Sequence, residues 1–158
     1  MSTSKIIQTT DSLLSYLSKF PRSLVFTNGV FDILHVGHIR YLQAAKELGA
    51  TLIIAINTDR SVQLLGKGDD RPINSEQDRA ELLAALSCVD LITFFNEKTP
   101  VRLLCEIKPD IYVKGGDYDM EQLEETRCIR SWGGESVALD FTAGKSTSNL
   151  IKKIREPS

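Results

Sequence analysis

Short apolar stretches alternate along the chain with segments of helical spacing. Strands are predicted at residues 23–27, 51–56, 89–95, 111–113 and 136–140, where apolar residues are consecutive or alternate with polar ones. The stretch 51–56, Thr-Leu-Ile-Ile-Ala-Ile, is apolar along almost its whole length. Such a run is typical of a strand in a parallel sheet that is covered on both faces.

Helices are predicted around these strands, at residues 11–20, 37–48, 74–86, 99–108, 120–132 and 146–154. The run from Asn74 to Gln77 resembles a capping box, and Thr99 and Pro100 supply a cap and a proline at the first helical position. Residues 57–73 are expected to form a long polar loop. The alternation of strands and helices predicts an α/β fold with a Rossmann-like, doubly wound parallel sheet.

Length and composition fit a single domain. The 158 residues contain no repeat, low-complexity tract or Pro/Gly-rich linker, so we expect one domain over residues 1–158. Lys and Arg number 19 against 21 Asp and Glu, and this net charge of −2 argues against general binding of nucleic acid or of a membrane surface. No stretch is apolar enough for a signal peptide or a membrane span, so the protein is expected to be cytoplasmic.

The three cysteines, Cys88, Cys105 and Cys128, are widely spaced and form no CxxC pair. This arrangement gives no sign of a zinc site or a redox motif. We therefore expect buried free thiols, and an activity and melting temperature that do not respond to reductant.

The loop after the first strand carries both histidines of the chain. It reads Thr27-Asn28-Gly29-Val30-Phe31-Asp32-Ile33-Leu34-His35-Val36-Gly37-His38 and lacks the dinucleotide and P-loop patterns. The glycines let backbone amides approach an anion, and a helix that begins near Gly37 points its free N–H groups to the same place. Imidazoles at His35 and His38 add donors for phosphate oxygens. Packing within the loop, or a metal held by the two histidines, is the alternative.

The glycine-containing loop 65–72 carries Lys67 and Arg71, which suit a mobile arm that closes over a polyphosphate. A solvated charged loop is the alternative. Arg79 lies one turn into the next helix and either points to the same cleft or has a surface or ion-pair role.

Two later segments follow strands. In Lys114-Gly115-Gly116-Asp117-Tyr118 the glycines permit the backbone to lie against a base or ribose, unless the segment is a simple turn. Ser146 and Thr147 open the last helix, where they either hold phosphate or serve as a plain cap. A P-loop is excluded here because Leu139 stands where its first glycine would be.

Together these segments resemble a known family. Gly29-Val30-Phe31-Asp32, followed by His35-Val36-Gly37-His38, is similar to the signature of the HxGH nucleotidyltransferases, the cytidylyltransferase-like superfamily. Other segments follow in family order, namely 71–74, Arg79, 89–90, 109–110, 113–118 and 146–147, so the resemblance covers about residues 23–154. Within the superfamily, 114–118 and 144–148 most resemble the adenylyltransferases of ADP-heptose synthesis, which act on D-glycero-β-D-manno-heptose 1-phosphate. The chain has Phe141-Thr142-Ala143-Gly144 where glycerol-phosphate cytidylyltransferases have Arg-Thr-Glu-Gly.

The resemblance implies transfer of AMP from ATP to a sugar 1-phosphate, with Mg2+ on the triphosphate, for the synthesis of lipopolysaccharide core or another heptose-containing glycan. It also makes a homodimer plausible. Catalytic roles are implied for His35, His38 and Lys67. The nucleotide is expected to contact Thr27, Asn28, Gly29, Phe31, Gly37, His38, Lys114, Gly115, Asp117, Ser146 and Thr147. The candidates for the substrate phosphate are Asp32, Lys67, Arg71 and Arg79.

Two other functions stay open at this point. One keeps the chemistry but uses CTP with glycerol 3-phosphate or another alcohol phosphate. The other is a non-catalytic nucleotide-binding or regulatory module on the same scaffold, since a fold alone does not determine activity. No metal ligand set is evident in the sequence, so the ion is expected to be held mostly by phosphates and water, with Asp32 and Asp117 as candidate helpers.

Overall fold

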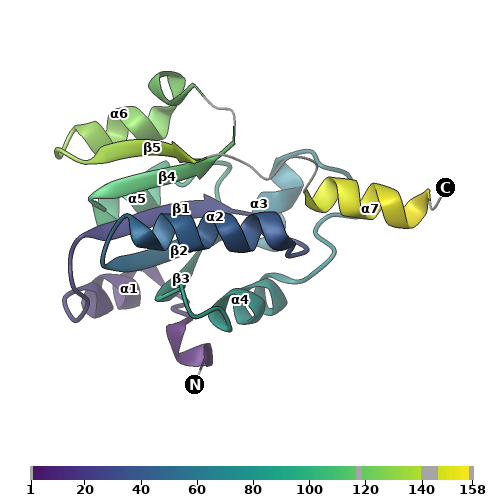
Figure 1. Ribbon diagram of the computed structural model, residues 1–158, viewed down its shortest axis with the longest axis horizontal. Coiled ribbons are helices and arrows are strands. Elements are labelled where there is room, and N and C mark those ends of the chain that lie inside the picture. Colours follow the sequence, from purple (N-terminus) through teal and green to yellow (C-terminus); the bar gives the residue numbers. More distant parts are fainter. Residues whose placement is uncertain (1, 117–118, 140–145, 157–158) are drawn as a thin grey trace.

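The computed structural model describes residues 2–116, 119–139 and 146–156. Its centre is a parallel sheet with the strand order β3-β2-β1-β4-β5 (Figure 1). The strands are β1 (Leu24–Gly29), β2 (Thr51–Asn57), β3 (Leu91–Phe95), β4 (Ile111–Gly115) and β5 (Glu135–Leu139). The predicted fold class, a Rossmann-like α/β sheet, is confirmed.

Helices cover both faces of the sheet. They are α1 (Thr10–Leu17), α2 (Val36–Glu47), α3 (Asp59–Leu64), α4 (Glu76–Ala84), α5 (Val101–Ile107), α6 (Glu124–Arg130) and α7 (Thr147–Arg155), with short 3-10 turns η1 (Ser2–Lys5) and η2 (Met120–Gln122). Figure 1 shows α7 beyond the end of the sheet towards which the strands point.

The core consists of two apolar layers, one on each face of the sheet. Alternate side chains of a strand point to opposite faces, so Leu24 and Phe26 belong to one layer and Val25 to the other. Helices α1, α5 and α6 pack in the first layer, and α2 and α4 pack in the second. This double cover explains why β2 is buried at every position.

The N-terminal segment extends the sheet beyond β3, which the sequence did not predict. Ile6 pairs with Ile92 in a parallel bridge, and the Ile7 amide donates to the Ile92 carbonyl at 2.8 Å. The Thr93 hydroxyl donates to the Ile7 carbonyl at 3.0 Å. These bonds occupy part of an edge that would otherwise present unpaired backbone groups to solvent.

Residues 57–73 are not wholly a loop, because they contain α3. The Thr58 side chain caps this helix by accepting a hydrogen bond from the Ser61 amide at 3.1 Å. Thr is a common N-cap, but a helix of only six residues shows too little apolar periodicity to be detected in the sequence.

Two predicted caps are wrong. Ser75, not Asn74, caps α4 by accepting from the Asp78 amide at 3.2 Å, because the Asn74 side chain donates to the Asp32 carbonyl at 2.7 Å. Helix α5 begins at Val101 with no side-chain cap.

The predicted helix 120–132 is divided into η2 and α6, which are separated by an extended Leu123.

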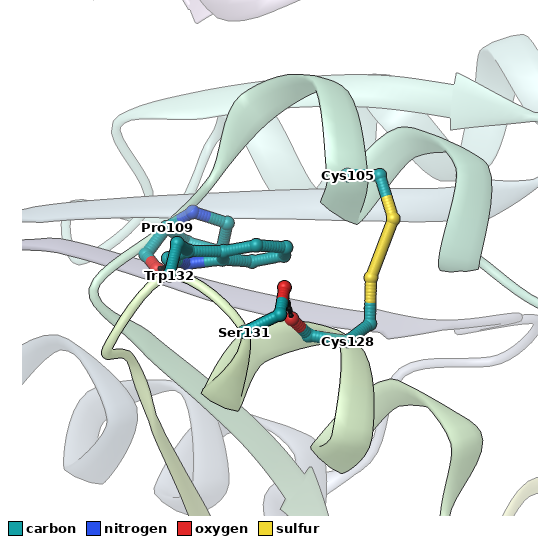
Figure 2. The surroundings of a disulfide bond; sticks show 5 residues. All are labelled: Cys105, Pro109, Cys128, Ser131 and Trp132. Carbon is teal, nitrogen blue, oxygen red and sulfur yellow. Dashed lines mark hydrogen bonds between the residues drawn. A yellow bond between two sulfur atoms is a disulfide. The ribbon is translucent and has the colours of Figure 1, made fainter.

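The prediction of buried free thiols is wrong for two of the three cysteines. Cys105 of α5 and Cys128 of α6 form a disulfide across a sequence separation of 23, and Cys88 is a half-buried free thiol. Figure 2 shows the bond between the two helices, near the hydrogen bond that the Trp132 indole donates to the Pro109 carbonyl at 2.8 Å. Nothing in the cysteine spacing indicated this pair, because it depends on how α5 and α6 pack against the sheet.

Within the described residues, no helix is long and apolar enough to cross a membrane.

Removing the disulfide will lower stability. A bond that closes a loop of this length is expected to stabilise the folded state by about 3 kcal/mol, chiefly by restricting the unfolded chain. Cys105→Ser, or addition of dithiothreitol to the wild type, should therefore shift the urea midpoint to lower concentration. Cys88→Ser is the control and should keep the sensitivity to reductant. Equal midpoints with and without reductant would contradict the bond.

Candidate active site

A cavity of about 720 Å³ lies at the carboxyl ends of the strands. Its walls are formed by the carboxyl ends of β1, β2 and β4, by the segments that follow β1, β2 and β3, and by the start of α7. From β1 the chain first adds β2 and β3 on one side and then returns to add β4 and β5 on the other side. The strand order therefore reverses between β1 and β4, and ligands of such sheets bind at this switch point. Most of the predicted site residues line it: Asn28, Gly29, Phe31, Asp32, His35, Gly37, His38, Lys67, Arg71, Lys114, Gly115, Ser146 and Thr147.

The two histidines stack at the N-terminus of α2. His35 is the N-cap residue, and its backbone amide donates to Nδ1 of His38 at 3.4 Å. The ring centroids are 3.8 Å apart, with 24° between the ring planes. Burial, together with the neighbouring His35, lowers the pKa of His38 to about 4. His38 is therefore neutral near pH 7, and because its Nδ1 is an acceptor, its proton is on Nε2, the atom left to donate to a ligand.

Gly29 has a steric role beside these rings. A Cβ at this position would lie 2.8 Å from Cε2 of Phe31, so a side chain here would displace the Phe31 ring. Phe31 has a φ of 50° and packs against His38 with ring centroids 5.1 Å apart. The missing side chain at Gly29 therefore lets the Phe31 ring lie close to the backbone, where it forms one wall of the histidine pair.

Asp32 fastens the loop that precedes α4. Its carboxylate, almost fully buried, accepts from Arg71 Nε at 2.8 Å and from the amides of Ile73 and Asn74 at 2.9 Å each. Burial opposes the ionisation of Asp32, but these hydrogen bonds outweigh it and hold its pKa below the usual range. Although Asp32 lines the cavity, its oxygens are engaged by the protein. It positions Arg71 and is not suited to meet a phosphate itself.

Lys67 projects from a segment shaped by two glycines. Gly66 has a φ of 69° and Gly68 a φ of 116°, conformations that other residues rarely adopt. Lys67 is on an exposed loop, yet it lines the cavity. Partial loss of hydration, followed by repulsion from Arg71, lowers the pKa of Lys67. The position of Lys67 on the cavity agrees with the prediction that the loop 65–72 carries a cation towards a ligand.

The carboxyl end of β4 brings Lys114 and Gly115 to the cavity. Thr27, by contrast, is fully buried, and its hydroxyl donates to the Val113 carbonyl at 2.9 Å and contacts the Tyr41 hydroxyl. Thr27 therefore fixes the end of β4 and does not line the cavity, which corrects its expected contact with the nucleotide. Asp117 lies outside the described residues.

The start of α7 closes the cavity. Ser146 is the N-cap residue: its hydroxyl oxygen accepts from the Asn149 amide at 3.0 Å, and the residue also lines the cavity. The Thr147 hydroxyl donates to the Ile33 carbonyl at 2.8 Å and joins α7 to the histidine loop. The backbone amides at the helix N-terminus and the O–H of Ser146 are the donors that this segment can offer to an anion.

Arg79 does not reach the cavity, which corrects its assignment as a phosphate candidate. Its guanidinium is fully buried and donates to the carbonyls of Val30 and Asn57 at 2.8 Å each and of Asn74 at 3.0 Å. It also forms an ion pair with Asp59 at 2.7 Å. Arg79 therefore joins the segments after β1 and β2 to the start of α4. Its planar fork of donors suits this multiple binding better than a lysine would.

Several lining residues were not predicted: Val30, Tyr41, Asn57, Leu65, Lys98, Ser148 and Asn149. Of these, Lys98 had a detectable signal, because it closely follows a predicted strand whose carboxyl end lies at the same edge of the sheet. The others depend on how the loops fold. Among residues 2–116, 119–139 and 146–156, no three His, Cys, Asp or Glu side chains converge on a point where they could hold a metal ion.

Replacement of Arg79 should destabilise the protein as well as the site. Arg79→Met leaves three carbonyls and one carboxylate without their donor, and the loss of a fully buried guanidinium from such a network costs about 3 kcal/mol or more. We expect a lower urea midpoint in circular dichroism. Arg127→Met, at an exposed position of α6, is the matched control. An unchanged midpoint for Arg79→Met would contradict the structural role.

The sequence of this chain is similar to known proteins of one family. A model of the cytidylyltransferase-like family matches residues 26–153. The chain is 60% identical over 138 residues to D-beta-D-heptose 1-phosphate adenylyltransferase of Bordetella bronchiseptica, and the match covers 87% of this chain and 85% of that protein. It is 48% identical over 145 residues to the bifunctional protein HldE of Hydrogenovibrio crunogenus, where the match covers 92% of this chain but only 30% of HldE.

Solved structures of other proteins share the fold of this chain. The lipopolysaccharide core biosynthesis protein from Thermoplasma volcanium superposes with a TM-score of 0.63 at 33% identity, over 75% of this chain and 95% of that one. Pantoate-beta-alanine ligase from Francisella tularensis has a TM-score of 0.64 at 16% identity, over 90% of this chain and 68% of that one, which is a likeness of fold alone. Because the family model spans most of the sequence, the chain belongs to the cytidylyltransferase-like family and is a nucleotidyltransferase.

Proposed function

We propose that this protein transfers AMP from ATP to D-glycero-β-D-manno-heptose 1-phosphate and so forms ADP-heptose and pyrophosphate. The observation that carries the proposal is the stacked pair His35 and His38 at the N-terminus of α2, in a cavity that also receives Lys67 and Lys114. The heptose 1-phosphate adenylyltransferase of Bordetella bronchiseptica, which is 60% identical, supports the choice of nucleotide and acceptor.

The reaction needs no nucleophile from the protein, because the acceptor phosphate is already an anion. One of its oxygens forms a bond to the α-phosphorus of ATP, the bond between that phosphorus and the bridging oxygen to the β-phosphate breaks, and pyrophosphate leaves with the electron pair. The protein must hold attacker and leaving group in line and offset the negative charge of two phosphates that approach each other.

The residues of the cavity are suited to both tasks. Neutral His38 donates from Nε2, and the amides at the start of α2 point their dipole at the same region. The ammonium of Lys67 and the guanidinium of Arg71 supply positive charge from the loop that precedes α4. Asp32 holds Arg71 in place by the 2.8 Å ion pair. Donors fixed in this way lower the barrier without reorganising during the reaction.

Mg2+ is proposed as part of the substrate, MgATP. Among the residues that the structure describes, the one buried carboxylate on the cavity is Asp32, and it accepts hydrogen bonds from three protein donors, which does not fit a metal ligand. In our proposal the ion is held by phosphate oxygens and water, as Mg2+ commonly is at nucleotide sites. No step of the mechanism above depends on a protein ligand to the metal.

Substitution of the histidines should abolish most of the activity. We expect His35→Ala and His38→Ala each to lower kcat by about 100-fold or more, the usual effect of removing a donor to developing phosphate charge. Pyrophosphate release measures kcat, and unchanged circular dichroism shows that the fold is kept. Near wild-type turnover in either variant would contradict its role.

Nucleotide preference tests the substrate assignment. With heptose 1-phosphate as acceptor, we expect kcat/KM for ATP to exceed that for CTP by at least about tenfold, since even one well-made contact to a base edge gives this ratio. A matrix of nucleotides and acceptors, read by pyrophosphate release, measures it. Preference for CTP with glycerol 3-phosphate would favour a cytidylyltransferase. No release with any pair would favour a binding module.

A further inference from the structure

Lys98 lines the cavity from the segment that follows β3, and nothing in the motif signature includes it. We propose that Lys98 binds the phosphate of the acceptor and orients it for attack, so that the acceptor site lies on the β2–β3 side of the cavity. This inference rests on the proposed function. It names a substrate-binding residue for that reaction.

The cavity has two sides that differ in origin. The histidine pair, Lys114 and the start of α7 come from the segments around β1, β4 and β5, at the switch point where a nucleotide is expected. Lys67 and Lys98 come from the segments after β2 and β3, on the other side. Because we assign the triphosphate to the first side, the second anion of the reaction is assigned to the second side.

The backbone that carries Lys98 is fixed by a buried polar chain. The Asn57 side chain donates to the Ser61 hydroxyl at 2.9 Å, and this hydroxyl donates to the Glu97 carbonyl at 2.6 Å. Ser61 is fully buried and Asn57 is 3% exposed. The Thr58 amide also donates to the Phe95 carbonyl at 3.0 Å. The end of β2 therefore sets the position of the segment after β3, and Lys98 projects from a rigid base.

The charge of Lys98 is available to a ligand. The adjacent carboxylate, Glu97, pairs with Arg102 at 2.6 Å, and Arg102 also binds Glu106 at 3.0 Å. Burial opposes the ionisation of Glu97, but the hydrogen bond from Arg102 outweighs it and lowers the Glu97 pKa. Within the described part of the chain, no carboxylate forms an ion pair with Lys98. An exposed ammonium on the same cavity as Lys67 would offset the charge of a phosphate that must approach the α-phosphate.

Steady-state kinetics of Lys98→Met test the inference. This change removes the charge and keeps the length of the side chain. We expect the KM for heptose 1-phosphate to rise at least about tenfold and the KM for ATP to change less than twofold, because loss of a contact present before reaction weakens binding of that substrate alone. Lys98→Arg should restore part of the acceptor affinity. Lys19→Met, a lysine on the Tyr16 ring next to α1, is the matched control.

The result separates this inference from the proposed function. If the wild type releases no pyrophosphate with heptose 1-phosphate, the proposed function fails. Lys98 is then judged by calorimetric titration of inorganic phosphate with α,β-methylene ATP present, a measurement that needs no turnover. Binding of phosphate at least fivefold weaker in Lys98→Met than in Lys19→Met supports the acceptor-side cation. An unchanged acceptor KM in an active enzyme, an equal rise in the KM for ATP, or unchanged phosphate affinity would overturn the inference.

Discussion

The buried guanidinium of Arg79 joins the parts of the cavity that come from different strands. It binds carbonyls in the segment after β1, at the end of β2 and just before α4, and none of these segments follows another directly in the sequence. A buried arginine is tolerated only when its donors are satisfied, so the three segments can take only the positions that satisfy it. Asp32 makes a second junction of the same kind, an anion that binds Arg71 and two backbone amides.

Because Arg79 and Asp32 make these structural contacts, Lys67 and the histidines remain for ligand binding. Lys67 lies between Gly66 and Gly68, on the segment that joins α3 to Arg71. This segment is held at its two ends, by α3 and by the ion pair of Arg71 with Asp32. The histidines are held differently, since the helix start and the ring stack fix their orientation. The cavity thus combines donors that are held by packing and hydrogen bonds with a lysine on an exposed, glycine-flanked loop.

The distribution of charge agrees with a reaction between two anions. His38 is neutral in the absence of ligand, because burial and the adjacent ring oppose its protonation. Two stacked imidazolium ions would repel each other, whereas a neutral ring can donate one hydrogen bond at no such cost. Permanent positive charge comes instead from Lys67, Arg71, Lys98 and Lys114, which reach the cavity from three different segments. Cations from several segments therefore surround one cavity at the carboxyl ends of the strands.

The sequence by itself determined the sheet, the alternating helices and the histidine loop. Apolar runs such as 51–56 require burial on both faces, and a motif such as 35–38 is local, so its residues are adjacent wherever the chain folds. Only the tertiary structure decided the contacts of Arg79 and Thr27, the position of Lys98 on the cavity and the pairing of the cysteines. Arg79 and Lys67 are both basic residues near one loop, and only burial separates a cation that binds backbone carbonyls from one that faces the cavity. The pairing of Cys105 with Cys128 was likewise undetermined, because contacts between elements far apart in the sequence depend on the packing of whole helices and leave no local pattern.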